Sequence, residues 1–383
     1  MDYILPIELF GDTNLAYFPK IIKRFTKFEN CFKFTDMKNI LLLVIVSMFT
    51  LTGWTNKDAV LLVSDYVVTD GSTDVADAIQ KIIDENPNRT IYFPDGTYML
   101  SHPIVTPADP KRSVHLELSN YAILKAAEGW KEGEAIVKLG GSHPFNNIMI
   151  VGSNYGLNGG IIDGSNVADG ISIDGGRETR IKEVSIKHTR IGIHIKHGAN
   201  SGSSDSDIVD VNIVGNNMPN SIGLLIEGFD NTFTNMRIYA VNKGVWCKTG
   251  GNSFRNIHPL FKYGEYQDYN SGCGFVIEAE NNFLNYCYSD QFATGFKLVG
   301  NGCYNLTDCF CFWYTDRGQS QTAIEADGKF NSMVSSIRIG FHPNCSNITV
   351  LKVKEEGGKG KLLHTILPNR EFSPSDVSAQ YLL

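Results

Sequence analysis

The chain of 383 residues has eight cysteines and no CxxC pair, which argues against zinc ribbons and thiol redox motifs. Its 13 prolines against 37 glycines, without a strict glycine period, are typical of a globular protein with many turns. Basic residues are not in excess, because the formal net charge is -7 and the pI is about 5.7, which disfavours a general nucleic-acid binder. We therefore expect no nucleic-acid partner. We expect no metal or cofactor either, because the acidic stretch 205–210 lacks the EF-hand glycine and glutamate.

The N-terminal region has no hydrophobic run long enough for a comfortable membrane span. An apolar core over residues 40–51 follows Met37 and Lys38 and ends at two small residues, as in a secretory signal peptide. We predict a signal peptide over residues 37–54 with Met37 as the true start, and hence a doubtful upstream extension over 1–36. The location would be secreted or periplasmic, with no stable membrane span after signal removal. The alternative is a genuine N-terminal extension followed by an uncleaved anchor.

The remainder of the chain, residues 60–383, is organised by an internal repeat of about 21 to 31 residues. One series of strand-like segments begins at residues 170, 192, 223, 244, 274, 295 and 323, nearly always with glycine, as in GISID, GIHIK and GLLIE. A second series, including IVDVNI at 208, FTNMRI at 233, FRNIHP at 254 and FLNYCY at 283, lies between them. Short β-rich units at such a period, without helical spacing, predict an all-β parallel solenoid.

Apolar residues alternate within these segments and define the expected interior. The inward set of the first series is Ile171/Ile173, Ile193/Ile195, Leu224/Ile226, Val245/Cys247, Phe275/Ile277, Phe296/Leu298 and Ile324/Ala326. For the second series we expect Phe233, Phe254, Phe283, Leu306 and Met333 to lie in register inside. Its third positions are Glu183, Asp210, Asn235, Asn256, Asn285, Asp308 and Ser335. The three successive asparagines predict a ladder at a tight turn, because asparagine tolerates the left-handed conformation.

The start of this region has helical spacing over residues 75–83, with Asp74 as a plausible N-cap. A short amphipathic helix here would cover the end of the solenoid and protect it from edge pairing. Together with TIYFPDGTYMLSHPI (90–104) and GGIIDG (159–164), this pattern resembles the pectate-lyase-like superfamily over residues 65–350. It looks closest to the glycoside hydrolase family 28-related and tailspike-like branches. The resemblance implies a single-stranded right-handed parallel β-helix with a short N-terminal capping helix.

The resemblance does not transfer catalytic residues. The polygalacturonase pattern has Asn-Thr-Asp, Asp-Asp, His-Gly and Arg-Ile-Lys, whereas here RIK (180–182) precedes HG (197–198) and the first two motifs are missing. We therefore sought candidates on the outer face of the first series, often the floor of the sugar cleft in superfamily members. One outward row contains His194, Trp246 and Lys297, and the next alternates Asp174, Lys196, Glu227, Lys248 and Glu278. The first row suits sugar stacking and proton transfer, and the second could be a structural salt-bridge ladder.

Long loops stacked on one edge form the other part of the predicted site, because aromatic and charged residues concentrate in them. We expect chemistry where the longest loop meets the first-series face, with Asp290 as the leading acid or base. The catalytic candidates are Asp290, Glu278, Asp268 and His258. The substrate-binding candidates are Trp246, His194, Tyr266, Tyr288, Lys297, Trp313, Tyr314 and Arg317.

The resulting prediction is a secreted carbohydrate-active enzyme that cleaves a polysaccharide or oligosaccharide, by glycoside hydrolysis with paired carboxylates. One alternative is a polysaccharide lyase acting on a uronate-containing glycan, with Lys, Arg, His or Tyr as base. Another is a non-catalytic glycan-binding or structural β-helix. The step from fold to enzyme is an analogy. The sequence leaves the sugar, its linkage and a homo-oligomeric state open.

Overall fold

The computed structural model describes residues 60–141, 155–197, 203–265, 267–315 and 320–367, together with Glu371, Ser373 and Asp376. The predicted signal peptide and upstream extension lie outside the described residues. Chain contacts separate Met1–Ala59 from a second unit, Val60–Leu383, and everything below concerns the second unit. In the described part of the chain, no helix is long and apolar enough to cross a membrane.

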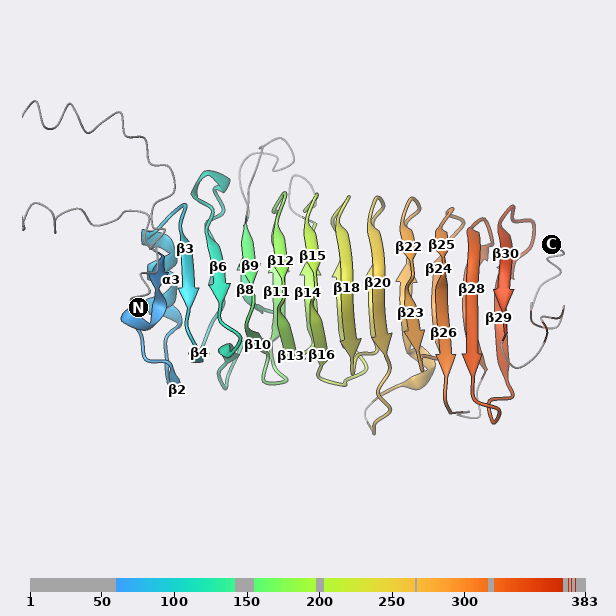
Figure 1. The fold of residues 1–383 in the computed structure, drawn as a ribbon, viewed down its shortest axis with the longest axis horizontal. Coiled ribbons are helices and arrows are strands. Elements are labelled where there is room, and N and C mark those ends of the chain that lie inside the picture. Colours follow the sequence, from blue (N-terminus) through green and yellow to red (C-terminus); the bar gives the residue numbers. More distant parts are fainter. Residues whose placement is uncertain are drawn as a thin grey trace, which may run out of the picture. The chain divides into compact units, whose positions relative to one another are not determined.

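In its described residues, the unit is a stack of parallel strands with one α-helix at its N-terminal end (Figure 1). Helix α3 (Ala76–Glu85) buries Ala76, Ile79, Ile82 and Ile83 on one face, so the predicted amphipathic helix is present. The N-cap residue is Val75 rather than the predicted Asp74, but the Asp74 carboxylate still accepts the Ala76 N–H at 3.0 Å and so supplies a partner for the first turn. Short 3-10 turns occur at Val63–Asp65, Pro110–Arg112 and Tyr269–Ser271.

A ten-stranded parallel sheet contains the first series of segments. Its strands are β5 (Ile104–Val105), β8 (Ala135–Leu139), β11 (Asp169–Ile173), β14 (Ile191–Ile195), β17 (Ile222–Ile226), β19 (Lys243–Cys247), β21 (Cys273–Ile277), β24 (Thr294–Val299), β27 (Gln321–Lys329) and β29 (Ile348–Glu355). The register pairs Ile171 with Ile193 and continues rung by rung as expected. All members of the predicted inward set are buried.

A twenty-stranded sheet contains the second series, split into two faces by a bend. Before the bend lie β1 (Leu61–Leu62), β3 (Thr90–Phe93), β6 (His115–Leu118), β9 (Gly156–Asn158), β12 (Arg180–Lys182), β15 (Asp207–Val209), β22 (Phe283–Asn285) and β25 (Asn305–Thr307). After it lie β2 (Asp70–Asp74), β4 (Gly96–Leu100), β7 (Ala122–Ala126), β10 (Ile161–Asp163), β13 (Ser185–Thr189), β16 (Asn212–Gly215), β23 (Tyr288–Asp290) and β26 (Cys309–Trp313). Both faces are joined by β18 (Thr232–Tyr239), β20 (Ser253–Leu260), β28 (Met333–Phe341) and β30 (Lys361–Ile366).

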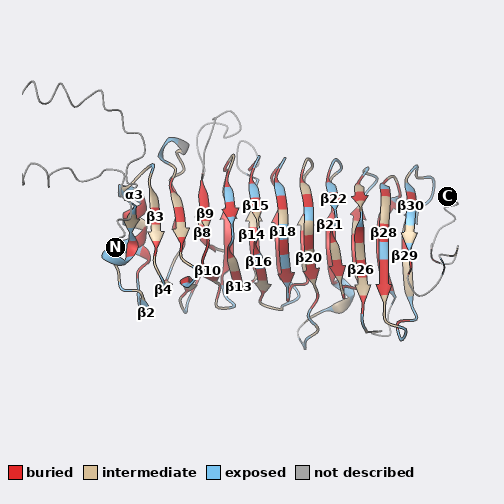
Figure 2. Ribbon diagram, viewed as in Figure 1, coloured by how far each residue is buried: buried red, intermediate tan, exposed pale blue. Residues whose placement is uncertain are grey.

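The two sheets enclose one apolar core, which continues through the successive rungs (Figure 2). Identical rings stack inside it, with Phe233 on Phe254 at 5.1 Å and Phe275 on Phe296 at 4.8 Å between centroids. The described cysteines are buried, except for Cys303, and five of them belong to this core: Cys247, Cys287, Cys309, Cys311 and Cys345. The architecture is the expected right-handed parallel β-helix.

The bend carries the predicted asparagine ladder, over fewer rungs than expected. Asn235 and Asn256 have positive φ, and their side-chain amides donate to Asp210 at 3.1 Å and to Asn235 at 3.0 Å. The prediction for Asn285 is wrong, because Tyr286 takes the left-handed position in that rung. Ser335 is also outside the set of residues with positive φ.

A second, buried asparagine ladder was not predicted, and it sets the register. The Asn231 N–H donates to the Asn252 side-chain oxygen at 3.1 Å, and the Asn252 N–H donates to that of Asn282 at 2.9 Å. Each of these asparagines precedes the inward apolar residue by two positions, so Leu284 follows Phe254 in register. The expectation for Phe283 is therefore wrong, and this side chain is 52% exposed.

Met333 is displaced in the same way. Leu306 pairs with Val334, which is buried, and Met333 is 39% exposed. In both rungs two apolar residues are adjacent, so alternation alone does not identify which one faces the core.

The glycines that begin the first-series segments are required by close packing between rungs. A Cβ on Gly223 would lie 2.5 Å from the Gly244 carbonyl oxygen, and one on Gly244 would lie 2.5 Å from that of Gly274. Real Cβ atoms do not approach so closely, so this row of glycines is a steric requirement of the stack.

Candidate functional site

The predicted site residues belong to two different sheets. His194, Trp246 and Lys297 lie on strands of the ten-stranded sheet, and Glu278 follows β21 of that sheet. His258, Tyr288 and Asp290 lie on β20 and β23 of the twenty-stranded sheet. The expectation that these residues converge at one site is therefore wrong, because the outer faces of the two sheets point away from their common core.

On the ten-stranded sheet, a column of charged residues runs along the outer face. Glu227, Lys248 and Glu278 occupy successive rungs, since the preceding residues Ile226, Cys247 and Ile277 are register partners. Lys248 Nζ lies 2.8 Å from Glu227 Oε1, and Lys196 Nζ lies 3.1 Å from Asp174 Oδ2. The column thus contains the predicted salt-bridge ladder.

Glu227 is a partly enclosed carboxylate of this column. Its second oxygen lies 2.9 Å from His194 Nε2, so both oxygens have cationic or hydrogen-bonding neighbours. Burial acts to raise the pKa of Glu227, but the hydrogen bonds from Lys248 and His194 outweigh it and lower the pKa below its usual value. Glu227 is therefore ionised at neutral pH.

Trp246 occupies the rung between Glu227 and Glu278. Its indole Nε1–H donates to Glu278 Oε1 at 2.6 Å, and the Lys248 ammonium lies 4.7 Å from the ring centroid. The ring also packs against the cluster of Ile191, Ile222 and Leu225, so it is partly buried. Glu278 is exposed beside it.

Lys297 lies further along the same face, within an ion-pair cluster. Its Nζ is 3.5 Å from Glu325 and 3.6 Å from Asp327. The lysine is held by two carboxylates, which is the arrangement of a structural ladder.

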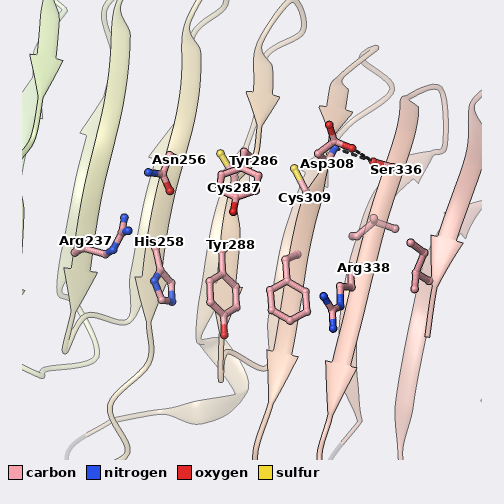
Figure 3. A pocket seen from close by; sticks show the side chains of 13 residues that line it. Arg237, Asn256, His258, Tyr286, Cys287, Tyr288, Asp308, Cys309, Ser336 and Arg338 are labelled. Carbon is pink, nitrogen blue, oxygen red and sulfur yellow. Dashed lines mark hydrogen bonds between the residues drawn. The ribbon is translucent and has the colours of Figure 1, made fainter. Parts of the chain in front are cut away.

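On the twenty-stranded sheet, a row of side chains lines a hollow of about 370 Å³ (Figure 3). We call this the aromatic groove: Arg237, His258, Tyr288, Phe310 and Arg338, on five successive rungs. The His258 and Tyr288 rings stack at 4.0 Å between centroids, and Tyr288 stacks on Phe310 at 4.6 Å. Both faces of Tyr288 are covered, so only ring edges reach a ligand.

Asp290 lies beside this stack and is largely enclosed. The Tyr288 hydroxyl donates to Asp290 Oδ2 at 3.1 Å, and His258 Nε2 lies 3.6 Å from the same oxygen. Burial, followed by the charge of Asp290, raises the pKa of Tyr288. Asp290 Oδ1 and His258 Nε2 are buried without a hydrogen-bond partner. The Asp290 carboxylate is therefore enclosed by Tyr288 and His258 and is not openly accessible for acid or base chemistry.

The loop candidates do not gather at either face. Asp268 is exposed and accepts the Asn270 N–H at 3.1 Å, which caps the short turn there. Trp313 is a correction: it is fully buried and its Nε1–H donates to the Phe292 carbonyl at 2.6 Å, so it is a core residue. Tyr314 is exposed beside His342. Tyr266 and Arg317 lie outside the described residues.

Sequence reasoning did not select Arg237, Phe310 or Arg338. Arg237 and Phe310 share a position with His258 in the aligned second series, so a signal was present. The one-residue displacement at Phe283 and Met333 moved Tyr288 and Arg338 out of that column and obscured the row. Among the described residues, no three His, Cys, Asp or Glu side chains are grouped to hold a metal ion.

Residues 63–273 match the family described as "Rhamnogalacturonase A/epimerase, pectate lyase-like". The chain belongs to this family. No curated protein sequence matches the chain.

Several solved structures share the fold at low sequence identity. ORF18 of Geobacillus virus E2 is 15% identical to this chain, with a TM-score of 0.54 over 88% of this chain. The match covers 66% of the ORF18 chain, so this chain spans just under two thirds of its length. An alginate lyase from Paenibacillus sp. str. FPU-7 is 14% identical with a TM-score of 0.53, covering 72% of this chain and 97% of its own. A DFA-IIIase from Arthrobacter chlorophenolicus A6 is 13% identical with a TM-score of 0.53, covering 84% and 96%. These similarities establish the fold.

Proposed function

We propose that the protein hydrolyses a polysaccharide on the outer face of its ten-stranded sheet, with Glu227 and Glu278 as the paired carboxyl groups. The observation that carries this proposal is their position in one column, two rungs apart, on either side of the rung that holds Trp246. Membership of a family described by rhamnogalacturonase and epimerase supports a polysaccharide substrate. The partly exposed indole supplies an apolar edge that a sugar ring can contact, because the Lys243 and Lys248 ammonium groups lie over the ring itself.

The spacing of the two carboxyl groups favours hydrolysis with inversion. Neighbouring rungs are ~4.8 Å apart, so alternate rungs are ~9.6 Å apart. Inverting enzymes separate their carboxyl groups by about 6.5–9.5 Å, which leaves space for a water molecule. A retaining pair at ~5 Å would require adjacent rungs, where Lys248 stands instead.

The environments of the two groups suggest different roles. Lys248 and His194 keep Glu227 ionised. Glu227 acts as the general base: it takes a proton from a water molecule, and the oxygen of that water attacks the anomeric carbon. Glu278 donates a proton to the departing glycosidic oxygen, so the C–O bond breaks without forming a free alkoxide. His194 and Lys248 hold Glu227 in place and are positioning residues.

The aromatic groove is a weaker candidate for hydrolysis. Asp308, the carboxylate among the residues that line the hollow, accepts a hydrogen bond from the Ser336 hydroxyl. Asp290 is enclosed by Tyr288 and His258 and has no second carboxylate described beside it. The described residues that line the hollow therefore include one carboxylate and no pair of them.

Four single variants test the proposal: Glu227→Gln, Glu278→Gln, Asp290→Asn and Glu325→Gln. We expect the first two to lower kcat by ~10²-fold or more, because each removes a proton-transfer group. Glu325→Gln is the matched control on the same face, and Asp290→Asn tests the other sheet; both should retain turnover within a few-fold. Substrates should be chosen first from rhamnogalacturonan-type and other acidic polysaccharides. A loss of turnover confined to Asp290→Asn would move the site to the aromatic groove.

The products separate the remaining possibilities. Hydrolysis releases reducing ends of inverted anomeric configuration, which proton NMR reads directly at early times. An unsaturated, ultraviolet-absorbing product would instead indicate elimination by a lyase. Binding without any product would indicate a non-catalytic glycan-binding protein.

A further inference from the structure

We propose that the aromatic groove on the twenty-stranded sheet is a second carbohydrate site, which binds the acidic groups of an anionic polysaccharide and does not cleave it. The groove lies on a different sheet from Glu227 and Glu278, so it is separate from the proposed cleavage face. It would hold the polymer while another segment of the same polymer is processed.

The ring stack excludes one common mode of sugar binding. His258, Tyr288 and Phe310 are packed face to face at 4.0 and 4.6 Å, and Arg338 lies over the remaining side of Phe310 at 5.4 Å. A sugar ring therefore has no free aromatic face in the middle of the groove. What the stack offers to a ligand is a row of ring edges.

The two arginines provide the charge for recognition. Arg237 and Arg338 are exposed, and in the described part of the chain neither has a carboxylate within ion-pair distance. A guanidinium group presents a planar fork of donors that matches a carboxylate with two parallel hydrogen bonds. The two nearest acids make their side-chain contacts elsewhere: the Asp308 carboxylate accepts a hydrogen bond from the Ser336 hydroxyl, and Asp290 accepts one from the Tyr288 hydroxyl.

The spacing of the arginines favours a polymer over a small anion. Arg237 and Arg338 occupy the first and last of five successive rungs, which places them ~19 Å apart along the solenoid axis. One small anion would contact a single arginine, whereas a chain with repeated carboxylates contacts both. Two linked contacts strengthen each other through effective concentration.

The aromatic stack also explains how an exposed arginine is kept ready for binding. Arg338 rests on Phe310, and Phe310 rests on Tyr288, so the guanidinium is supported by a fixed platform. A supported side chain loses less rotamer entropy when it binds. Phe310 is therefore a positioning residue for Arg338.

The test measures binding of polygalacturonate and of the same polymer after its carboxyl groups are reduced to neutral hydroxymethyl groups. Binding is followed by titration calorimetry on the chain carrying Glu227→Gln and Glu278→Gln, and the polymer is sized afterwards to verify that it is intact. Into this background we introduce Arg237→Gln with Arg338→Gln. The matched control is Arg255→Gln, an exposed arginine on β20 outside the groove.

We expect the double arginine variant to weaken polygalacturonate binding by about tenfold or more and to reduce its salt dependence. The Arg255→Gln chain should bind within about twofold, and the neutral polymer should bind weakly to every chain. Phe310→Leu should weaken polygalacturonate binding less than Arg338→Gln does. Arg338→Gln should also weaken binding less in the Phe310→Leu chain than in the chain that retains Phe310.

Three results would overturn the inference. These are unchanged binding in the double variant, an equal loss in Arg255→Gln, or equal binding of the acidic and neutral polymers. None of them depends on catalysis. A wild-type chain that fails to release sugar products bears on the cleavage proposal alone.

Discussion

At the scale of single residues, Phe254 and Phe283 have opposite environments. Phe254 is buried and stacked on Phe233, whereas Phe283 lies on the surface of the next rung. We expect Phe254→Ala to lower the free energy of unfolding by about 3–5 kcal/mol, because it leaves a cavity in a packed core. Phe283→Ala should change it by less than about 1 kcal/mol. Urea unfolding of the two variants measures both, and equal losses would contradict the register.

Phe254 and Phe283 also show where alternation in the sequence predicts the inward residues correctly and where it fails. Alternation correctly identified the inward residues of the seven segments from β11 to β27 in the ten-stranded sheet, where a polar, charged or small residue often separates two apolar ones. It failed where Phe283 adjoins Leu284 and where Met333 adjoins Val334, because both neighbours are apolar. The buried asparagines decide the Phe283 case, since the Asn282 side-chain oxygen accepts the backbone N–H of Asn252 in the previous rung, and the Met333 case follows from the pairing of Leu306 with Val334. Such a bond between distant residues depends on the folded stack.

At the scale of elements, the rows along the sheets are the units that maintain the stack. We expect Gly223→Ala to destabilise the protein by roughly 1–3 kcal/mol, because the new Cβ would overlap the Gly244 carbonyl oxygen and Ile238. The equivalent position in β27 is already Ala323, which is buried. Ala323→Gly is the reverse control and should cost no more than about 1 kcal/mol. Thermal unfolding compares the two, and a Gly223→Ala chain as stable as the wild type would contradict the steric requirement.

The long loop of residues 261–272 shows why element-level prediction of the site was incomplete. Its aromatic residues were interpreted as a cleft wall. Instead, Phe261, Tyr263 and Tyr269 pack against one another at 5.3 to 5.5 Å, and Phe261 packs on Phe292. Aromatic side chains in a loop can pack against a ligand or against one another, and amino-acid composition does not distinguish the two.

At the scale of the whole molecule, the N-terminal sequence predicts a secreted or periplasmic location. We expect a chain beginning at Met37 to be exported and trimmed near residues 50–56, because a basic residue and a short apolar run form a signal sequence. N-terminal sequencing of the exported protein measures this. An exported protein that retains residues 41–46 would contradict cleavage, and reversal of Lys38 to Glu is a suitable control for export.

Whole-molecule geometry also separated residues that are close in sequence. His258, Glu278, Tyr288 and Asp290 lie within a short stretch of the chain and were expected at one site. The chain passes from one sheet to the other between them, so Glu278, which follows β21, and Asp290, on β23, belong to different sheets of the β-helix. The result is two separate faces, a paired-carboxylate column and an arginine-flanked groove, each with its own test.

The sequence by itself determined the parallel solenoid, the capping helix, the inward rows of the ten-stranded sheet and the charged ladder on its outer face. These features follow from period, alternation and local turn chemistry, which act between residues near in the chain or repeated along it. Tertiary structure alone decided the register of the two displaced rungs, the burial of Trp313 and the division of the predicted site between two sheets. Those outcomes depend on contacts across rungs and around the cross-section, where hydrogen bonds and packing join residues that no local pattern relates.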